Sequence, residues 1–147
     1  MITVYVDGLT EPVNPGGVGT IGFAVYRDGE RLHREARVIG EGPTISNNRA
    51  EYEALNGALQ WLLEHGLSAE EVEVHSDSRL LVNQMQGRWA VKGGLYMAAH
   101  ERAKILASRF PRLSIRWVPR EENEEADSLS REAYERYVGS RASRRMG

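Results

Sequence analysis

The chain has 147 residues, a formal net charge of −2 and no cysteine. This length predicts one domain with a substantial core, and the absence of cysteine excludes a disulfide framework and cysteine-ligated zinc. No apolar run reaches membrane-spanning length and the N-terminus lacks a signal pattern, so we expect a cytoplasmic protein with no membrane partner.

Three strands are predicted to open the chain. Residues 2–6 form a near-continuous apolar run, which is typical of a central strand buried on both faces. After a turn-rich loop over residues 7–17, apolar residues alternate with smaller or polar ones over 20–27. The Asp28-Gly29 pair then signals a tight hairpin, returning into a strand over about 32–39. The first part of the domain is therefore expected to be antiparallel.

The rest of the chain alternates helices with strands. Asn47 or Asn48 is expected to cap a first helix that ends near Gly66. The remaining elements are predicted as strands over 72–76 and 113–117, and helices over about 78–86, 95–109 and 123–137. This pattern predicts an α/β fold with a five-stranded mixed sheet, three antiparallel strands then two parallel, flanked by helices. We expect the domain to cover residues 1–138, followed by a flexible basic tail over 139–147.

Four acidic residues stand where a globular protein does not usually gather negative charge. Taken singly, each has an ordinary explanation. Asp7 can belong to a turn, Glu51 to a capping box with Asn48, and Asp77 can cap the next helix. Asp127 can complement the positive end of the last helix.

Taken together, these carboxylates predict one site. Asp7 and Asp77 end strands that are expected to run parallel as neighbours, and such strands place their ligands at the same sheet edge. Glu51 lies on the apolar stripe of a helix, where an unpaired carboxylate is costly or takes up a proton. A divalent cation removes that penalty, and a carboxylate cluster of this kind suits magnesium-dependent phosphodiester cleavage.

Other motifs carry no comparable signal. The segment Gly17–Gly22 matches the dinucleotide-binding fingerprint by letters, but it runs into a strand and not into a helix. The four histidines have no metal-ligand spacing, and neither a nucleophile elbow nor a Walker lysine is present. We therefore expect no small-molecule cofactor.

Five segments, in the same order along almost the whole chain, resemble ribonuclease H of the type 1 branch, including the ribonuclease H domains of reverse transcriptases. They are Val4-Tyr-Val-Asp7-Gly8, Asn14-Pro-Gly-Gly, Ser46-Asn47-Asn48-Arg49-Ala50-Glu51, His75-Ser-Asp77-Ser78 and Asn123-Glu-Glu-Ala-Asp127. The resemblance implies an endonuclease that hydrolyses the RNA strand of RNA–DNA hybrids, leaving 5′-phosphate and 3′-hydroxyl ends.

The resemblance also implies the site residues. Asp7, Glu51, Asp77 and Asp127 match the catalytic carboxylates that hold two Mg²⁺ or Mn²⁺ ions, with Asp7 placed to bridge both. Asp127 would complete the ion on the side of the attacking water, and Glu51 and Asp77 would hold the other ion. The residues implied to contact nucleic acid are Gly8, Asn14, Ser46, Asn47, Asn48, Arg79 and Arg120.

The chain departs from the family pattern at four places. Only residues 87–94 stand where some members carry a long basic protrusion. No histidine precedes Asp127, and Arg120 stands in that loop as a permanent cation. Arg79 follows Asp77-Ser78, and at this position we expect an arginine contact with a phosphate in place of a side-chain contact with a base edge. The loop from Asp7 to Asn14 is slightly longer than the common pattern.

Three alternatives stay open beside this interpretation. The first is a non-catalytic nucleic-acid-binding module on the same fold, although retaining all four carboxylates gives a pure binder no advantage. The second is a transposase or integrase core, which needs added DNA-binding domains. The third is a phospho-acceptor receiver, which needs regular strand–helix alternation from its start. A monomer is the expected state.

Overall fold

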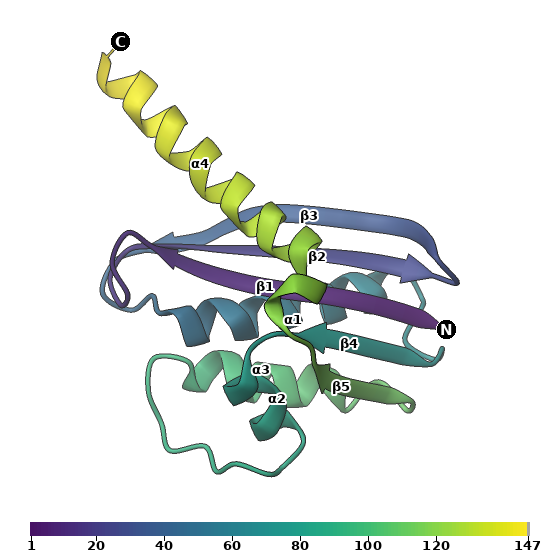
Figure 1. The fold of residues 1–147 in the computed structure, drawn as a ribbon. Coiled ribbons are helices and arrows are strands. Elements are labelled where there is room, and N and C mark those ends of the chain that lie inside the picture. The colour runs from purple at the N-terminus through teal and green to yellow at the C-terminus, as the bar shows by residue number, and fades with distance from the viewer. Residues whose placement is uncertain (147) are drawn as a thin grey trace.

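A five-stranded mixed sheet forms the centre of the protein (Figure 1). The structure is a computed structural model that describes residues 1–146. The strands are β1 (Ile2–Glu11), β2 (Val18–Arg27), β3 (Glu30–Glu41), β4 (Val72–Ser76) and β5 (Leu113–Trp117). They lie in the order β3-β2-β1-β4-β5, with antiparallel pairing from β3 to β1 and parallel pairing from β1 to β5. The predicted mixed sheet is confirmed.

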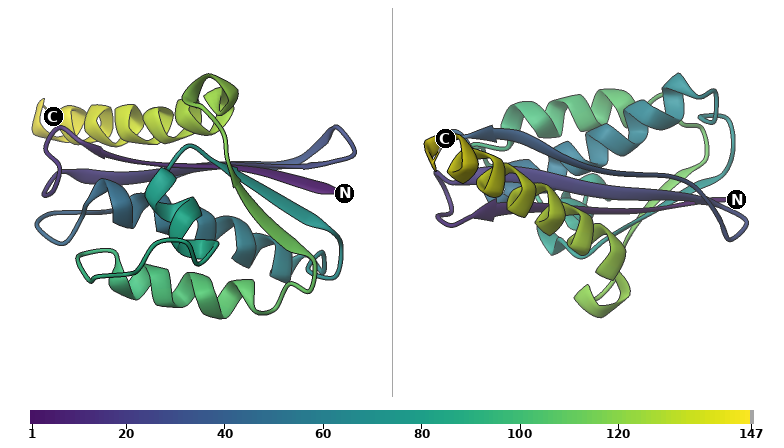
Figure 2. Two further views of the ribbon diagram at one scale, coloured as in Figure 1. Left: turned by 60° about the horizontal axis from the view of Figure 1, so that its bottom comes forward. Right: turned by 90° about the horizontal axis from the view of Figure 1, so that it is seen from above.

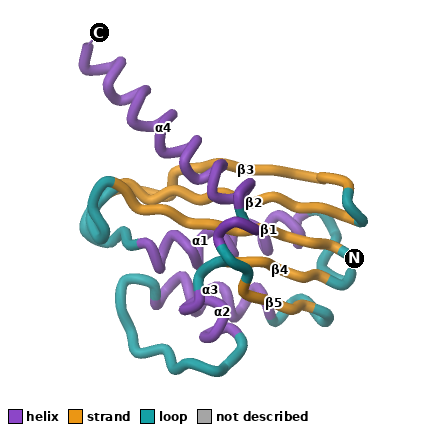
Figure 3. Tube along the Cα trace, in the orientation of Figure 1, coloured by secondary structure: helices purple, strands orange, loops and turns teal. Residues whose placement is uncertain are grey.

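Helices cover both faces of the sheet (Figure 2). One face carries α1 (Asn47–Glu64), α2 (Arg79–Met85) and α3 (Met97–Ala107). The other face carries α4 (Glu124–Met146), which follows a short 3-10 turn, η1 (Arg120–Glu122). A long loop joins α2 to α3 (Figure 3). No helix in the described part of the chain is long and apolar enough to cross a membrane.

The alternation of side chains along β1 decides which residues enter the core. Ile2, Val4 and Val6 are almost fully buried and belong to one apolar cluster with the inner face of α1. Because successive side chains point to opposite faces of a sheet, Asp7 lies on the face that α4 covers. The same strand therefore supplies both the core and a functional side chain.

Two glycines let the flanking helices approach the sheet closely. A Cβ at Gly8 of β1 would lie 2.2 Å from the backbone carbon of Ala50 in α1. A Cβ at Gly22 of β2 would lie 2.4 Å from the carbonyl oxygen of Ala126 in α4. Real side chains do not tolerate such distances, so the tight seating of both helices depends on the missing Cβ.

The end of β4 leaves an opening in the sheet beside β1. The last parallel pair joins Val6 to Ser76, whereas β1 continues to pair with β2 as far as Glu11. The prediction that Asp7 ends its strand is therefore wrong, because the antiparallel partner extends the strand by four further residues. From Asp7 onward, however, β4 no longer flanks β1.

Two further boundaries differ from the predictions. Ser46 caps α1 by accepting the N–H of Arg49 at 3.2 Å, so neither Asn47 nor Asn48 is the cap. The last helix runs to Met146 and not to about residue 137. Its later turns are attached to the end of β3, because Arg141 contacts both carboxylate oxygens of Glu41 at 2.7 Å. The division into a domain and a tail stays a prediction, and Gly147 lies outside the described residues.

Candidate active site

Three carboxylates meet where β4 ends beside β1. Asp7 lies on β1, Glu51 lies near the start of α1, and Asp77 directly follows β4. One carboxylate oxygen from each of them lies within 4.8 Å of the other two. Three of the four acidic residues singled out in the sequence are thus neighbours in space. We call these three residues the carboxylate cluster.

Glu51 is oriented by a backbone contact with the neighbouring strand. The N–H of Gly8 donates a hydrogen bond to Oε1 of Glu51. The carboxylate therefore turns toward β1 and not back to its own helix terminus, so the capping-box explanation is wrong. Gly8 is also a point where α1 packs closely against β1. The same glycine therefore allows the close packing of the helix and orients the carboxylate of Glu51.

Asp7 is oriented from the opposite face of the sheet. Ser130 of α4, which is fully buried, places its hydroxyl 3.1 Å from Oδ2 of Asp7 and 2.8 Å from the carbonyl oxygen of Asp127. The backbone of Ser130 is in turn held by the Thr20 hydroxyl of β2 at 2.8 Å. The last helix therefore supports a residue from the first strand.

Burial and mutual repulsion raise the pKa of all three carboxyls. Asp7 is 7% exposed, and its pKa rises to about 7, mainly because burial removes water and also because Asp77 lies near. The pKa of Glu51 lies well above its ordinary value because of burial and the charge of Asp7. The pKa of Asp77 is raised by burial, although the nearby Arg120 opposes this. The cluster therefore lacks positive charge and favours uptake of protons or cations.

The cluster suits an oxygen-ligated divalent cation. Oδ2 of Asp77 is buried and has no hydrogen-bond partner among the described residues. Oxygen ligands of one magnesium ion lie no more than about 4 Å apart, and the three carboxylate oxygens lie within 4.8 Å of one another. A hard cation between them would satisfy the free oxygen and offset the repulsion. The donor set therefore fits Mg²⁺ or Mn²⁺.

Asp127 lies beside the cluster but outside it. It is in the first turn of α4, where its Oδ2 pairs with Nε of Arg131 at 3.3 Å. Its charge contributes to the raised pKa of both Asp7 and Asp77, so it is electrostatically coupled to the cluster. The structure thus places the fourth carboxylate as a neighbour, and its role as a metal ligand stays a prediction.

The N-terminal end of α1 gathers several residues that were assigned to nucleic-acid binding. Asn47 and Asn48 are exposed in its first turn, directly after the Ser46 cap. The side chain of Asn14 accepts the backbone N–H of Asn47 at 3.0 Å and so ties the β1–β2 loop to the helix. The geometry gives Asn14 and Ser46 structural functions, and the contacts of all four with nucleic acid stay predictions.

Arg79 and Arg120 are exposed, and both belong to segments near Asp77: Arg79 begins α2, and the charge of Arg120 opposes the rise in the pKa of Asp77. The Arg79 guanidinium lies over the indole ring of Trp117, 4.2 Å from its centre. The indole N–H donates to the carbonyl oxygen of Asp77 at 3.2 Å. An arginine stacked on an aromatic ring loses less freedom when it binds an anion, which favours a fixed phosphate contact.

Sequence reasoning missed three supporting residues: Trp117, Asn123 and Ser130. Trp117 was read as an alternating strand residue, and only its 37% exposure marks it as accessible. Ser130 stands three positions after Asp127, a spacing that places both on one helix face, but serine at such a position carries no specific signal. Asn123 was recognised as part of a motif without any function of its own.

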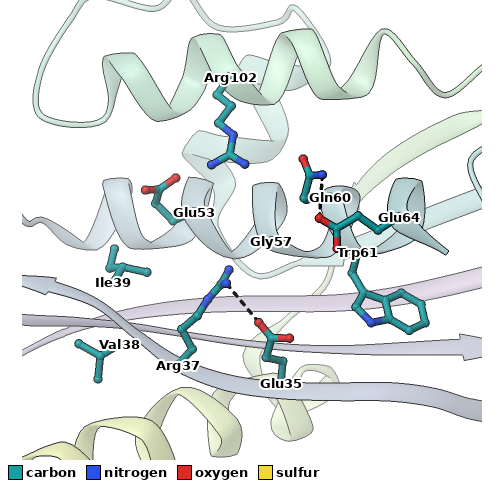
Figure 4. Close-up of a pocket in the computed structure, with 10 residues that line it drawn as sticks. All are labelled: Glu35, Arg37, Val38, Ile39, Glu53, Gly57, Gln60, Trp61, Glu64 and Arg102. Atoms are coloured by element: carbon teal, nitrogen blue, oxygen red, sulfur yellow. Dashed lines mark hydrogen bonds and ion pairs between the residues drawn. The ribbon is translucent and has the colours of Figure 1, made fainter.

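A separate groove lies between β3, α1 and α3 (Figure 4). It encloses about 380 Å³, and Arg37 and Arg102 extend into it from opposite sides. None of the four acidic residues singled out in the sequence lines this groove. Its own acidic residues have partners: Glu35 contacts Arg37 at 3.4 Å, and Glu64 accepts from Gln60 at 3.0 Å.

Comparisons with known proteins give consistent results. Residues 14–133 match a family described as reverse transcriptase-like. The bifunctional protein Rv2228c of Mycobacterium tuberculosis is 36% identical over 142 residues, which cover 96% of this chain and 37% of that protein. Ribonuclease HI of Halobacterium salinarum is 33% identical over 132 residues, covering 90% of this chain and 63% of that protein. The chain thus spans less than two thirds of either relative.

A solved structure is similar over nearly its whole length. LC11-RNase H1, in complex with an RNA/DNA hybrid, superposes with a TM-score of 0.85 at 37% identity. The match covers 94% of this chain and 99% of that one.

Proposed function

The chain belongs to the type 1 ribonuclease H family, and on this premise we propose that it hydrolyses the RNA strand of RNA–DNA hybrids. The products would carry 5′-phosphate and 3′-hydroxyl ends. The observation that carries the proposal is the convergence of Asp7, Glu51 and Asp77 from three separate elements. The similarity to LC11-RNase H1, which was solved with a hybrid, supports the substrate.

The carboxylate cluster would hold the divalent ions that this chemistry needs. Asp7, Glu51 and Asp77 supply the oxygen ligands, and the pKa of Asp7 near 7 means that protons compete with the ions at neutral pH. The chemistry that such ions would supply is a lowered pKa for the attacking water and an offset to the charge on the leaving 3′-oxygen. Asp127, whose Oδ2 lies 3.3 Å from Nε of Arg131, would complete the ion on the side of the attacking water.

The remaining predicted residues would position the hybrid. Asn47 and Asn48, exposed at the start of α1, are available to the minor groove, where the 2′-hydroxyl distinguishes RNA from DNA. Arg79, stacked on Trp117, would hold a phosphate beside the cluster. Arg120 lies near Asp77 and would reduce the repulsion between the cluster and the nucleic-acid backbone.

A non-catalytic binding module on the same fold is the alternative. Against it stands the cost of burying three neighbouring carboxyl groups, which a module that only binds a phosphate backbone does not need. The two functions differ in one property, since a binding module leaves the hybrid intact when divalent ions are added.

The deciding experiment follows labelled nucleic acids over time. End-labelled hybrid, single-stranded RNA and duplex DNA are each incubated with the protein and Mg²⁺, Mn²⁺ or a chelator. We expect cleavage of the hybrid RNA with either ion and none with the chelator. The Asp7→Asn variant, checked for folding by circular dichroism, is expected to be inactive because it lacks the charge that the ions require. A hybrid that stays intact with both ions would remove the proposed function.

A further inference from the structure

Asn123 joins the first strand to the last helix in the interior of the protein. It lies between η1 and α4 and is only 1% exposed. Its side-chain amide donates to the carbonyl oxygen of Val6 at 2.9 Å, and Val6 directly precedes Asp7. Its backbone carbonyl oxygen accepts the N–H of Asp127 at 3.1 Å, an ordinary hydrogen bond of the first helical turn. Asn123 thus has one side-chain contact beside Asp7 and one backbone contact with Asp127.

The same side chain also lies near Asp77. The amide group of Asn123 has two N–H donors, and Val6 takes one of them. The amide is close enough to the Asp77 carboxyl to oppose the rise in its pKa. The orientation of the amide is fixed, because the carbonyl oxygen of Val6 can accept a hydrogen bond only from the nitrogen side. A neutral donor is therefore directed into a group of negative charges.

We propose that Asn123 is a positioning residue whose side chain sets the spacing of Asp7 and Asp77 for divalent ions. The inference rests on the proposed function and adds a residue to it. An asparagine suits this position because its amide can donate two hydrogen bonds without adding charge. Serine is too short to reach both partners, and aspartate would add a further negative charge where positive charge is lacking.

A second buried asparagine provides a matched comparison. Asn56 of α1 is also 1% exposed, and its amide donates to the carbonyl oxygen of Ala99 in α3 at 3.0 Å and to Oε1 of Glu53 at 3.2 Å. Its side-chain oxygen, like that of Asn123, has no partner among the described residues. Asn56 therefore makes the same kind of buried contact between elements, but Asp7, Asp77 and Asp127 are not among its partners.

The experiment compares Asn123→Ser with Asn56→Ser. Thermal unfolding measures the structural cost of each change, and titration calorimetry with Mn²⁺ measures ion affinity without turnover. We expect both variants to lose thermal stability, while only Asn123→Ser loses Mn²⁺ affinity, by about tenfold or more. Its kcat on the hybrid should fall, while the KM for the hybrid should change little. Residues that merely stabilise the fold would not produce this separation.

Three other results would each overturn a specific part of the proposal. If folded Asn123→Ser binds Mn²⁺ as the unchanged protein does, Asn123 does not position the carboxylates. If it is unfolded, Asn123→Gln and Asn123→Ala replace it, and loss of the fold in all three assigns Asn123 a purely structural role. If the unchanged protein itself binds no Mn²⁺, the proposed function fails, which is distinct from failure of the positioning role.

Discussion

The carboxylate cluster and the groove between β3, α1 and α3 both contain acidic side chains, but these side chains differ in the partners that surround them. In the groove, Glu35 is contacted by His33 at 3.0 Å and by Arg37, and Glu64 accepts from Gln60 (Figure 4). In the cluster, Asp7 accepts a hydrogen bond from the hydroxyl of Ser130, and its neighbours Glu51 and Asp77 are themselves acidic. Acidic side chains that have local partners are ordinary features of a protein surface. Buried acidic side chains without a cationic partner indicate a site that binds positive charge from outside the protein.

The largest difference between the two regions should be in activity. Glu51 and Glu64 lie on the same helix, so Glu51→Gln and Glu64→Gln form a matched pair. Glutamine at position 51 can still accept from Gly8 but removes a charge from the cluster, and we expect hydrolysis to fall roughly 1,000-fold. Glu64→Gln should stay within about twofold of the unchanged protein, because a surface charge contributes little. Initial rates on labelled hybrid measure both, and equal losses would contradict the contrast.

The second difference should be in stability as a function of pH. The folded protein holds a proton on Asp7 up to about pH 7, whereas in the unfolded chain this group loses its proton near 3.8. The folded state therefore binds more protons between these values, and its stability falls as the pH rises through that window. The Asp7 contribution is roughly 2–4 kcal/mol of unfolding free energy.

Urea unfolding at pH 5 and pH 8 in the presence of a chelator measures this loss. Asp7→Asn should reduce it, and added Mn²⁺ should restore stability to the unchanged protein at pH 8. Glu35→Gln, the control from the groove, should keep the full pH dependence. If the unchanged protein were more stable at pH 8 than at pH 5, and Asp7→Asn were not, the raised pKa assigned to Asp7 would be contradicted.

The smallest expected difference concerns two arginines. Arg79 stands over Trp117 beside the cluster, and Arg102 extends into the groove. Arg79→Ala should weaken hybrid binding about tenfold and lower the salt slope of the affinity by about 1, because one phosphate contact is lost. Arg102→Ala should change neither value. Both are measured by fluorescence anisotropy at several salt concentrations, in a Glu51→Gln background that does not cut.

The sequence predicts the sheet well because its strands are strongly patterned. The apolar run over residues 2–6 and the alternation over 113–117 correspond to β1 and β5, and Asp77 follows β4 as expected. It does not predict that β1 continues past Asp7, because the antiparallel partner that extends it is a tertiary contact. Local propensity cannot foresee such pairing.

The site shows the same division. The four carboxylates are recognisable from their motifs, and three of them meet in the structure. The residues that hold them are hidden, because Ser130 and Asn123 act through hydrogen bonds to partners more than 100 positions away. The partners of a serine or an asparagine of this kind are known only once the chain has folded.

The docking of α4 against β1 has a consequence for biosynthesis. Asp7, Glu51 and Asp77 leave the ribosome before the helix that contacts Asp7, because that helix begins only at Glu124. The hydrogen bond from Ser130 to Asp7 can therefore form only after α4 has been synthesised and has folded back onto β1.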